Sequence, residues 1–200
     1  DSIQKEYPDF QRAFADLETK AIRSCTDKWF PKLTPEQAFG ALTPNSDQFG
    51  RTTILPALFD DNTGTPMDTT HGGGSPAGTW RQKFTTKGHQ MILQGNRTGE
   101  VLPEDFYVSW IGLAFPNKQM NISEIRWQTS DRKYVRLNIE ELMSYNKPAI
   151  IFEEGFLLKE EQAFHLYGHV EEEDYQRIVM LGAAYYRVID KVLGAPGSAI

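Results

Sequence analysis

Apolar residues at helical spacing predict a long amphipathic helix at the start of the chain. Pro8 suits its first turn, while Lys20 and Arg23 complement the helix dipole near its end. This apolar face must be covered, either by the body of the same chain, which is the commoner arrangement, or by a neighbouring molecule. Steps of three and four residues place six side chains on the face: Ile3, Tyr7, Phe10, Phe14, Leu17 and Ala21.

Capping boxes predict two shorter helices. Thr34 and Gln37 stand at the two positions of one box, with Pro35 at the first helical position. Asn138 and Glu141 have the same spacing and predict a helix that runs through residue 144.

A first strand and a long loop follow the N-terminal helices. Residues 43–51 have the pattern of a loop, and residues 52–59 predict a strand that Pro56 restricts to a sheet edge. Turn-forming residues dominate the loop at 60–78, where three consecutive glycines form a hinge. We therefore expect three parts: an N-terminal helical arm with its first strand at 1–59, a Gly-rich hinge loop at 60–78 and a jelly-roll-like body at 79–195.

Alternating apolar and polar positions predict a series of short strands in this body. The nearly continuous apolar run at 106–115, bounded by Pro103 and Pro116, predicts a central strand. Other predicted strands lie around Trp80 and Phe84, at 89–94, around Ile125 and Trp127, around Val135 and Leu137, at 149–152 and at 156–158.

The last two predicted strands differ in how clearly the pattern defines them. Residues 163–170 alternate, with three polar or aromatic side chains, His165, Tyr167 and His169, on the face opposite the apolar one. Residues 175–189 fit either a buried strand or one face of a helix. We favour the strand, because it would pair with 163–170 across a four-residue acidic turn.

The number and spacing of these elements indicate the fold class. About eight or nine short strands, most of them after residue 79, are separated by turn signals. The sequence therefore predicts a mainly β protein, an antiparallel β-sandwich or jelly roll with an N-terminal helical arm.

Charge and hydropathy narrow the classes of function. The chain has 200 residues and a formal net charge of −6, from 21 basic and 27 acidic side chains. This balance argues against nucleic-acid binding through bulk electrostatics. No apolar run approaches the ~18 residues of a membrane-spanning helix. Four cations around a predicted hairpin are interpreted as solvated charges rather than a nucleic-acid patch: Arg126, Arg132, Lys133 and Arg136.

Three isolated residues carry little functional information. Cys25 is the only cysteine and excludes an intrachain disulfide; its place near the apolar stripe indicates a packed thiol rather than a nucleophile. Asn96 and Asn121 begin glycosylation sequons, which matter only if the chain is secreted.

Two patterns could be metal sites, and both fit simpler interpretations. On a strand, His165 and His169 lie about 13 Å apart, too far to share one metal, so we interpret them as solvent-facing. The segment 60–64 (DDNTG) resembles the start of a calcium loop, but no glutamate stands at the twelfth position. An Asx-rich turn explains that segment better.

The Gly-rich segment 72–78 invites comparison with phosphate-binding and nucleophile loops. A P-loop needs a lysine that the segment lacks. Ser75 resembles the serine of a nucleophile elbow, but Ala77 replaces the second glycine, and Pro76 removes a backbone N–H from the oxyanion hole. A flexible linker is the better interpretation.

Paired carboxylates are the remaining candidates for catalysis. They lie at 153–154, 160–161 and 171–174. Acid–base chemistry needs two of them at a fixed separation in a cleft, whereas charged residues also protect strand edges from unwanted pairing, which we favour. With no catalytic constellation, metal site or cofactor site recognised, we expect a protein that is not an enzyme.

The segment 149–193 resembles the closing strands of viral jelly-roll capsid proteins. Its features are an apolar strand leading into a Gly turn, an alternating strand, an acidic turn and a final apolar-aromatic strand. The helical arm and Gly-rich hinge also look like those of such proteins, whose arms tie neighbouring subunits together. The resemblance implies a self-assembling coat subunit of a virion. Such a subunit would contact copies of itself through the N-terminal helix and the sandwich edges, and other coat proteins as well. It implies no particular site residues.

Two other classes remain open. A secreted or cell-surface β-sandwich that binds carbohydrate or protein would use exposed aromatic side chains such as Trp110, Tyr167 or Tyr185 as platforms. A hydrolase or metal-dependent enzyme would need His165, His169 and a nearby carboxylate to converge.

Overall fold

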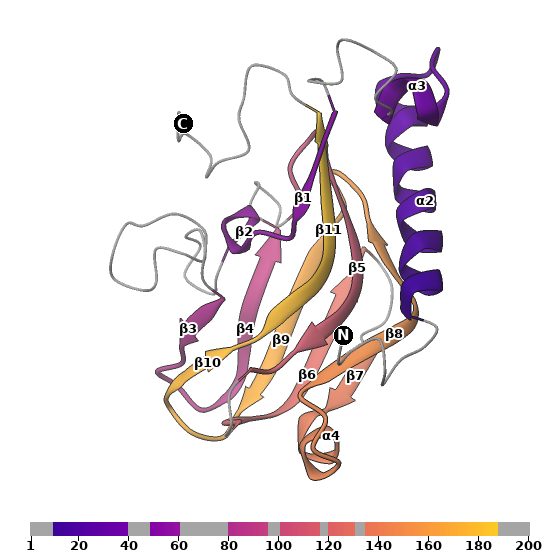
Figure 1. Ribbon diagram of the computed structural model, residues 1–200. Helices are drawn as coiled ribbons and strands as arrows, with labels where there is room; N and C mark the ends of the chain where they lie inside the picture. Colours follow the sequence, from indigo (N-terminus) through magenta and orange to yellow (C-terminus); the bar gives the residue numbers. More distant parts are fainter. Residues whose placement is uncertain are drawn as a thin grey trace.

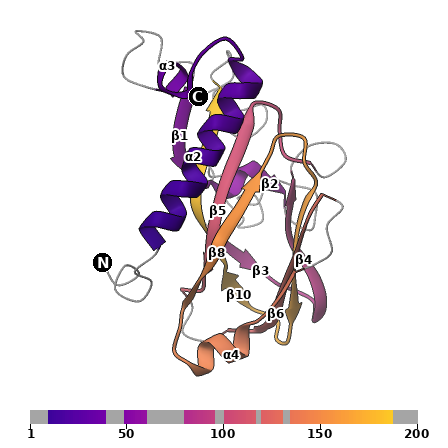
Figure 2. The same ribbon diagram turned by 90° about the vertical axis from the view of Figure 1, so that its right-hand side faces the viewer.

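Two antiparallel β-sheets pack against each other, and a long helix lies along the outer face of one of them (Figures 1 and 2). The computed structural model describes residues 10–39, 49–60, 80–95, 101–116, 120–130 and 135–187. The predicted class, mainly β with antiparallel sheets and an N-terminal helix, is confirmed. Among these residues, no helix is long and apolar enough to cross a membrane.

The first sheet has four strands in the order β1-β11-β5-β8. At its centre β5 (Phe106–Ala114) pairs with β11 (Val179–Arg187) on one side and with β8 (Ala149–Leu158) on the other. The strand β1 (Phe49–Thr53) completes the sheet beside β11. Nearly every residue of β5 is buried, because one of its faces meets the second sheet and the other meets the helix. The central strand predicted at 106–115 is therefore confirmed.

The second sheet has five strands in the order β2-β4-β9-β6-β7, and a separate two-stranded sheet joins β3 to β10. Along β9, Phe164, Leu166 and Val170 are buried. His165, Tyr167 and His169 alternate with them on the opposite face and are half-buried, as the predicted alternation requires. The strands have these bounds: β2 Phe59–Asp60, β3 Arg81–Lys83, β4 Gly88–Gly95, β6 Ile122–Thr129, β7 Val135–Asn138, β9 Phe164–Val170 and β10 Tyr175–Arg177.

The strand pairs are nested about the β6–β7 hairpin. Outside that hairpin β5 pairs with β8, then β4 with β9, then β3 with β10, and β1 with β11. The innermost pair, β6 with β7, lies in the second sheet. The next pair, β5 with β8, lies in the first sheet, and the pair outside it, β4 with β9, lies in the second sheet again. The chain is therefore arranged as one long antiparallel hairpin that is rolled across two sheets.

Aromatic side chains fill the space between the two sheets. Trp110 on β5 is fully buried and meets Trp127 on β6 and Phe164 on β9 edge-on, at ring-centroid distances of 5.2 and 5.7 Å. The indole N–H of Trp110 donates to the carbonyl of Gly112 at 2.7 Å, so its polar atom is satisfied. Burying each large apolar side chain stabilises the fold by about 1.5–3 kcal/mol.

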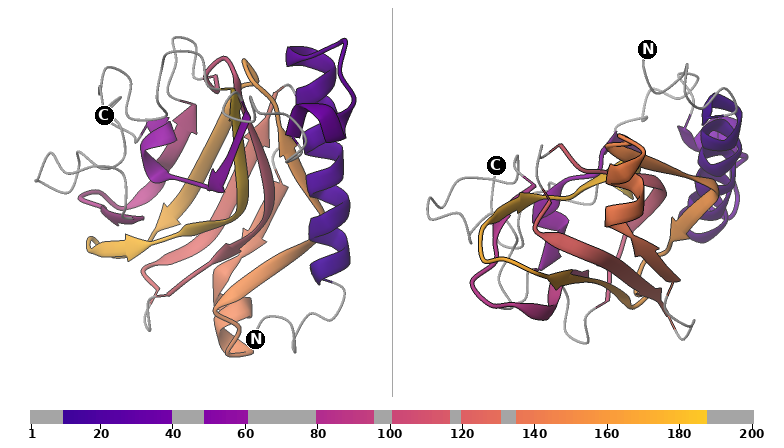
Figure 3. Two further views of the ribbon diagram at one scale, coloured as in Figure 1. Left: turned by 45° about the horizontal axis from the view of Figure 1, so that its top comes forward. Right: turned by 90° about the horizontal axis from the view of Figure 1, so that it is seen from below.

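The N-terminal helix α2 (Phe10–Trp29) packs on the first sheet rather than extending away from it. In both views of Figure 3 it stands outside the strands. The predicted apolar stripe is confirmed at Leu17 and Ala21, which are buried on the inner face together with Cys25, whereas Ile3 and Tyr7 lie outside the described residues. This face is therefore covered by the body of the same chain, which is the first of the two alternatives.

Both capping boxes form the helices that they predict. In α3 (Pro35–Phe39), the hydroxyl of Thr34 accepts from the N–H of Gln37 at 3.3 Å, and the side chain of Gln37 accepts from the N–H of Thr34 at 2.9 Å. In α4 (Ile139–Ser144), Asn138 accepts from the N–H of Glu141 at 2.9 Å. The predictions hold because a capping box depends only on residues close in sequence.

Three segments differ from the prediction. The loop expected at 43–51 is wrong from Phe49 onward, where β1 begins. The single strand expected at 52–59 is also wrong: β1 ends at Thr53, a 3₁₀ turn starts at Pro56, and β2 begins at Phe59 in the other sheet. Proline fixes φ and lacks an N–H, so it suits the first position of that turn. Two strands were expected at 149–152 and 156–158, but β8 is one strand whose register shifts.

Strand rather than helix is confirmed for 175–187, with 188–189 outside the described residues, but the segment forms two strands and its expected partner is wrong. It comprises β10 and β11, which pair with β3 and with β1 and β5. It does not pair with β9, because the acidic turn at 171–174 carries the chain out of the second sheet. The predicted hinge lies outside the described residues, apart from Asp60.

Candidate functional site

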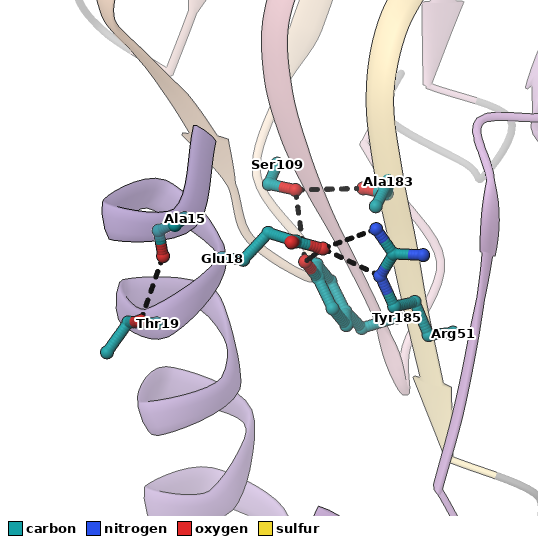
Figure 4. Close-up of polar contacts among 7 residues, drawn as sticks. All are labelled: Ala15, Glu18, Thr19, Arg51, Ser109, Ala183 and Tyr185. Carbon is teal, nitrogen blue, oxygen red and sulfur yellow. Dashed lines mark hydrogen bonds and ion pairs between the residues drawn. The ribbon is translucent and has the colours of Figure 1, made fainter. Parts of the chain in front are cut away.

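The carboxylate of Glu18, whose side chain is 23% exposed, holds the first half of helix α2 to the first sheet. Glu18 Oε1 accepts a hydrogen bond from the hydroxyl of Tyr185 on β11 at 2.9 Å and from Arg51 Nε on β1 at 2.6 Å (Figure 4). The Tyr185 hydroxyl lies 3.3 Å from Ser109 Oγ, which also contacts the carbonyl of Ala183. Burial raises the pKa of Tyr185, and the hydrogen bond to Glu18 raises the pKa of Arg51.

A second carboxylate holds the end of the helix. Glu160, between β8 and β9, accepts from the indole N–H of Trp29 at 3.1 Å and from the backbone N–H of Asp105 at 2.8 Å. Lys28 lies 3.4 Å from the other oxygen of the same carboxylate, whose side chain is only 8% exposed. Burial, with a smaller effect of the Glu160 charge, raises the pKa of Tyr107 to about 12.

These two clusters fasten the helix to the rest of the fold. Cys25 lies between them, fully buried, and burial raises the pKa of its thiol. The predicted packed thiol is confirmed, since a neutral buried thiol is a poor nucleophile. Sequence reasoning missed the roles of Glu18 and Arg51 and named Glu160 only as part of an acidic pair.

The histidines lie on the outer face of the second sheet. His169 faces His89 across β9 and β4, with the rings edge-on at 4.7 Å, and its Nε2 lies 3.3 Å from Glu171 Oε1. His165 stacks on Tyr167 at 6.1 Å instead. The two histidines of β9 thus have separate partners. Within the described ranges, no group of three or more His, Cys, Asp or Glu side chains could hold a metal ion.

The aromatic platforms proposed for a sugar are mostly inaccessible. Trp110 and Tyr185 are both 0% exposed, so that prediction is wrong for them. Trp110 is buried between the two sheets, and Tyr185 is buried on the other face of its sheet under helix α2. Tyr167 is half-buried, with the guanidinium of Arg126 5.1 Å from its ring. Asn121, the start of one sequon, is only 6% exposed.

The predicted cation cluster is only partly described. Arg136 on β7 is the register partner of Arg126 on β6, and its side chain lies 3.8 Å from Glu124. Arg132, Lys133, Asn96 and the segments 61–64 and 72–78 lie outside the described residues.

A groove of about 1,020 Å³ opens where β7 and β8 lie on the same side of the sandwich. Val135 to Leu137 of β7 line one side, Ile150 to Leu157 of β8 line the other, and Trp127 of β6 lies in its wall. Glu153 and Glu154 are exposed at the middle of β8. The interpretation of this pair as a charged turn is wrong, because both residues lie within β8, which is the end strand of its sheet; their role in protecting that edge stays a prediction. No pattern in the sequence predicted this groove.

Comparison with known proteins adds no relative, since no protein-family model, no curated protein and no solved structure matches this chain. The physical arrangement alone therefore carries any functional inference.

Proposed function

We propose that this protein is a structural, self-assembling subunit with a jelly-roll fold, as in the coat of a virus. The nested strand pairing supports this proposal most directly. A jelly roll is a two-sheet sandwich of eight strands formed by two Greek keys, and a long hairpin rolled across two sheets produces that connectivity. Viral capsid proteins are one of the main groups that use it.

The sandwich edges are the better-supported surfaces for assembly. Helix α2 uses its apolar face within the chain, where two carboxylates and the packing of Tyr107 hold it. Docking of that face on a neighbour would require release of all these contacts. The strands β7 and β8, in contrast, end their sheets beside an open groove. Contacts with other coat proteins and a location in the virion belong to the same proposal.

The mass of the native, untagged particle tests this function. Light scattering and negative-stain images of one sample should show a closed shell, a lattice or a discrete oligomer of many copies. A monomer at high protein concentration and across a range of salt concentrations and pH would reject the proposal.

A secreted or cell-surface binding module is the second candidate. The outer face of the second sheet supports it, because Tyr167 and three histidines lie there in paired contacts beside Arg126. Aromatic rings with adjacent polar groups suit a sugar ring or a polar protein surface. A glycan array with the wild-type protein and with Tyr167→Ala separates this candidate from assembly, since only a binding module loses a specific signal.

A further inference from the structure

The open side of the sandwich presents two uncovered strand edges. In the first sheet β8 is the last strand, and in the second sheet β7 is the last strand. No described strand pairs with the outer side of either one. A strand edge of this kind is a template for pairing with another chain unless something covers it or makes pairing unfavourable.

The groove between these edges has an apolar interior. Phe152 and Phe156 of β8 are half-buried there and pack on each other at 5.2 Å. Val135 of β7 is 41% exposed, one of the few large apolar side chains left so accessible among the described residues. Trp127 in the groove wall is 3% exposed, and its indole N–H has no acceptor within the described part of the chain. An occupant of the groove would remove the exposed apolar surface of Val135 and of the half-buried Phe152 and Phe156 from water.

The two rims of the groove carry opposite charges. Glu153 and Glu154 stand side by side on β8, are exposed, and have no ion pair or hydrogen bond with any described residue. The side chain of Arg136 on β7 is 65% exposed, and its ion-pair distance to Glu124, 3.8 Å, is long for a strong contact. A partner that presents its own β7 to this β8 would place a cation near two uncompensated carboxylates.

We propose that a second copy of this chain occupies the groove through a two-fold axis, with β7 of each copy beside β8 of the other. In an isologous contact the same surface serves both copies, so one groove with an acidic and a basic rim is complementary to itself. The alternative pairing, β8 against β8, brings four glutamates together and is opposed by repulsion. This interface rests on the proposed self-assembly and specifies the contact from which the assembly is built.

A charge-reversal experiment on the full chain tests the interface. The variant Glu153→Arg with Glu154→Arg should raise the dissociation constant of the two-fold contact about tenfold or more, measured by analytical ultracentrifugation. Arg136→Glu alone should also raise the dissociation constant of the two-fold contact. The three changes together restore complementary rims and should recover assembly. The matched control, Glu172→Arg with Glu173→Arg, makes the same charge change in an exposed turn on another part of the molecule and should leave assembly unchanged.

The outcomes separate this inference from the proposed function. Suppose that the wild-type protein assembles and that the Glu153/Glu154 variant has the same dissociation constant as the control variant. The proposed interface is then wrong, and the proposed self-assembly stands. The interface is also overturned if the triple variant does not assemble although circular dichroism shows that it is folded. A wild-type monomer rejects both. Binding of a basic peptide or a glycan in the groove of a monomer would assign the groove to a different occupant and overturn the second copy.

Discussion

Glu18 of helix α2 and Tyr185 of strand β11 are joined by a hydrogen bond of 2.9 Å across 167 residues of sequence. The bond connects the first described helix of the chain to the strand that comes last in chain order (Figure 4). Because Arg51 of β1 shares the same carboxylate oxygen, the helix, β1 and β11 are held at a single point. The N-terminal helix is therefore a third layer of the fold in this chain.

Removal of the Tyr185 hydroxyl should weaken this attachment. Tyr185→Phe leaves the buried ring in place but takes a donor from Glu18 and a partner from Ser109, so we expect a loss of about 1–2 kcal/mol in the free energy of unfolding. Tyr186→Phe is the matched control on the next residue of β11, because no hydrogen bond of its hydroxyl is found among the described residues. Urea unfolding measures both variants, and equal midpoints would reject the role of the hydroxyl.

Alkaline pH should destabilise the helix–sheet interface before it affects other parts of the fold. Burial raises the pKa of Tyr107 to about 12 from 10.0, and it also raises the pKa of Cys25 and of Tyr185. A group whose pKa is raised on folding keeps its proton in the folded state after the unfolded chain has lost it. Stability is therefore complete below the unfolded pKa and falls as pH rises, for Tyr107 between pH 10 and about 12.

Unfolding midpoints in urea at pH 8, 10 and 11 measure this loss. The slope contributed by one such group is at most about 1.4 kcal/mol per pH unit. In Tyr107→Phe the fall between pH 10 and 11 should be shallower than in the wild-type protein. Identical slopes for the two proteins would show that this tyrosine does not carry the effect.

The sequence predicted those parts of the fold that depend on neighbouring residues. The apolar stripe through Leu17 and Ala21 and the capping residues Thr34 and Asn138 act within one or two turns of helix. The alternation in β9 likewise reports directly which side chains face the core. Pairing partners are different, because they depend on how the chain crosses between sheets. Proximity in sequence favoured 163–170 as the partner of 175–189, whereas the rolled hairpin brings β3, β1 and β5 to it.

The candidate sites were harder to predict for a related reason. Trp110 is buried because its face of β5 meets the second sheet, and Tyr185 is buried because a helix far away in sequence covers the opposite face of the first sheet. Glu18 and Glu160 are single carboxylates with no motif around them, and contacts 167 and 131 residues away give them their role. The groove depends on two strand edges meeting on one side, which no local pattern records.

Glu160 should contribute more to stability than any exposed glutamate of this chain. Glu160→Ala leaves the indole N–H of Trp29 and the backbone N–H of Asp105 without their acceptor in a buried place, which we expect to cost about 2–4 kcal/mol. Lys28→Ala removes only the exposed partner of the same carboxylate and should cost less than about 1 kcal/mol. Thermal and urea unfolding of the two variants measure this ratio. Similar losses for both would mean that the ion pair, rather than the hydrogen bonds, fastens the helix.

Among the glycines in the described ranges, Gly182 should be the least able to accept a side chain. It lies at the register shift between β11 and β5 with φ of +151°, and a Cβ there would collide with the backbone carbonyl of Ser109. Because a backbone atom cannot rotate away, Gly182→Ala should displace β11 from the central strand and cost about 1–3 kcal/mol or more. Gly88→Ala is the comparison, since its φ is +92° but no atom lies within 4 Å of the new Cβ, so only backbone strain of about 1–2 kcal/mol applies. Urea midpoints give the order of the two losses, and hydrogen exchange locates them. The explanation fails if Gly88→Ala is the more damaging change or if exchange in β5 and β11 stays as slow as in the wild-type protein.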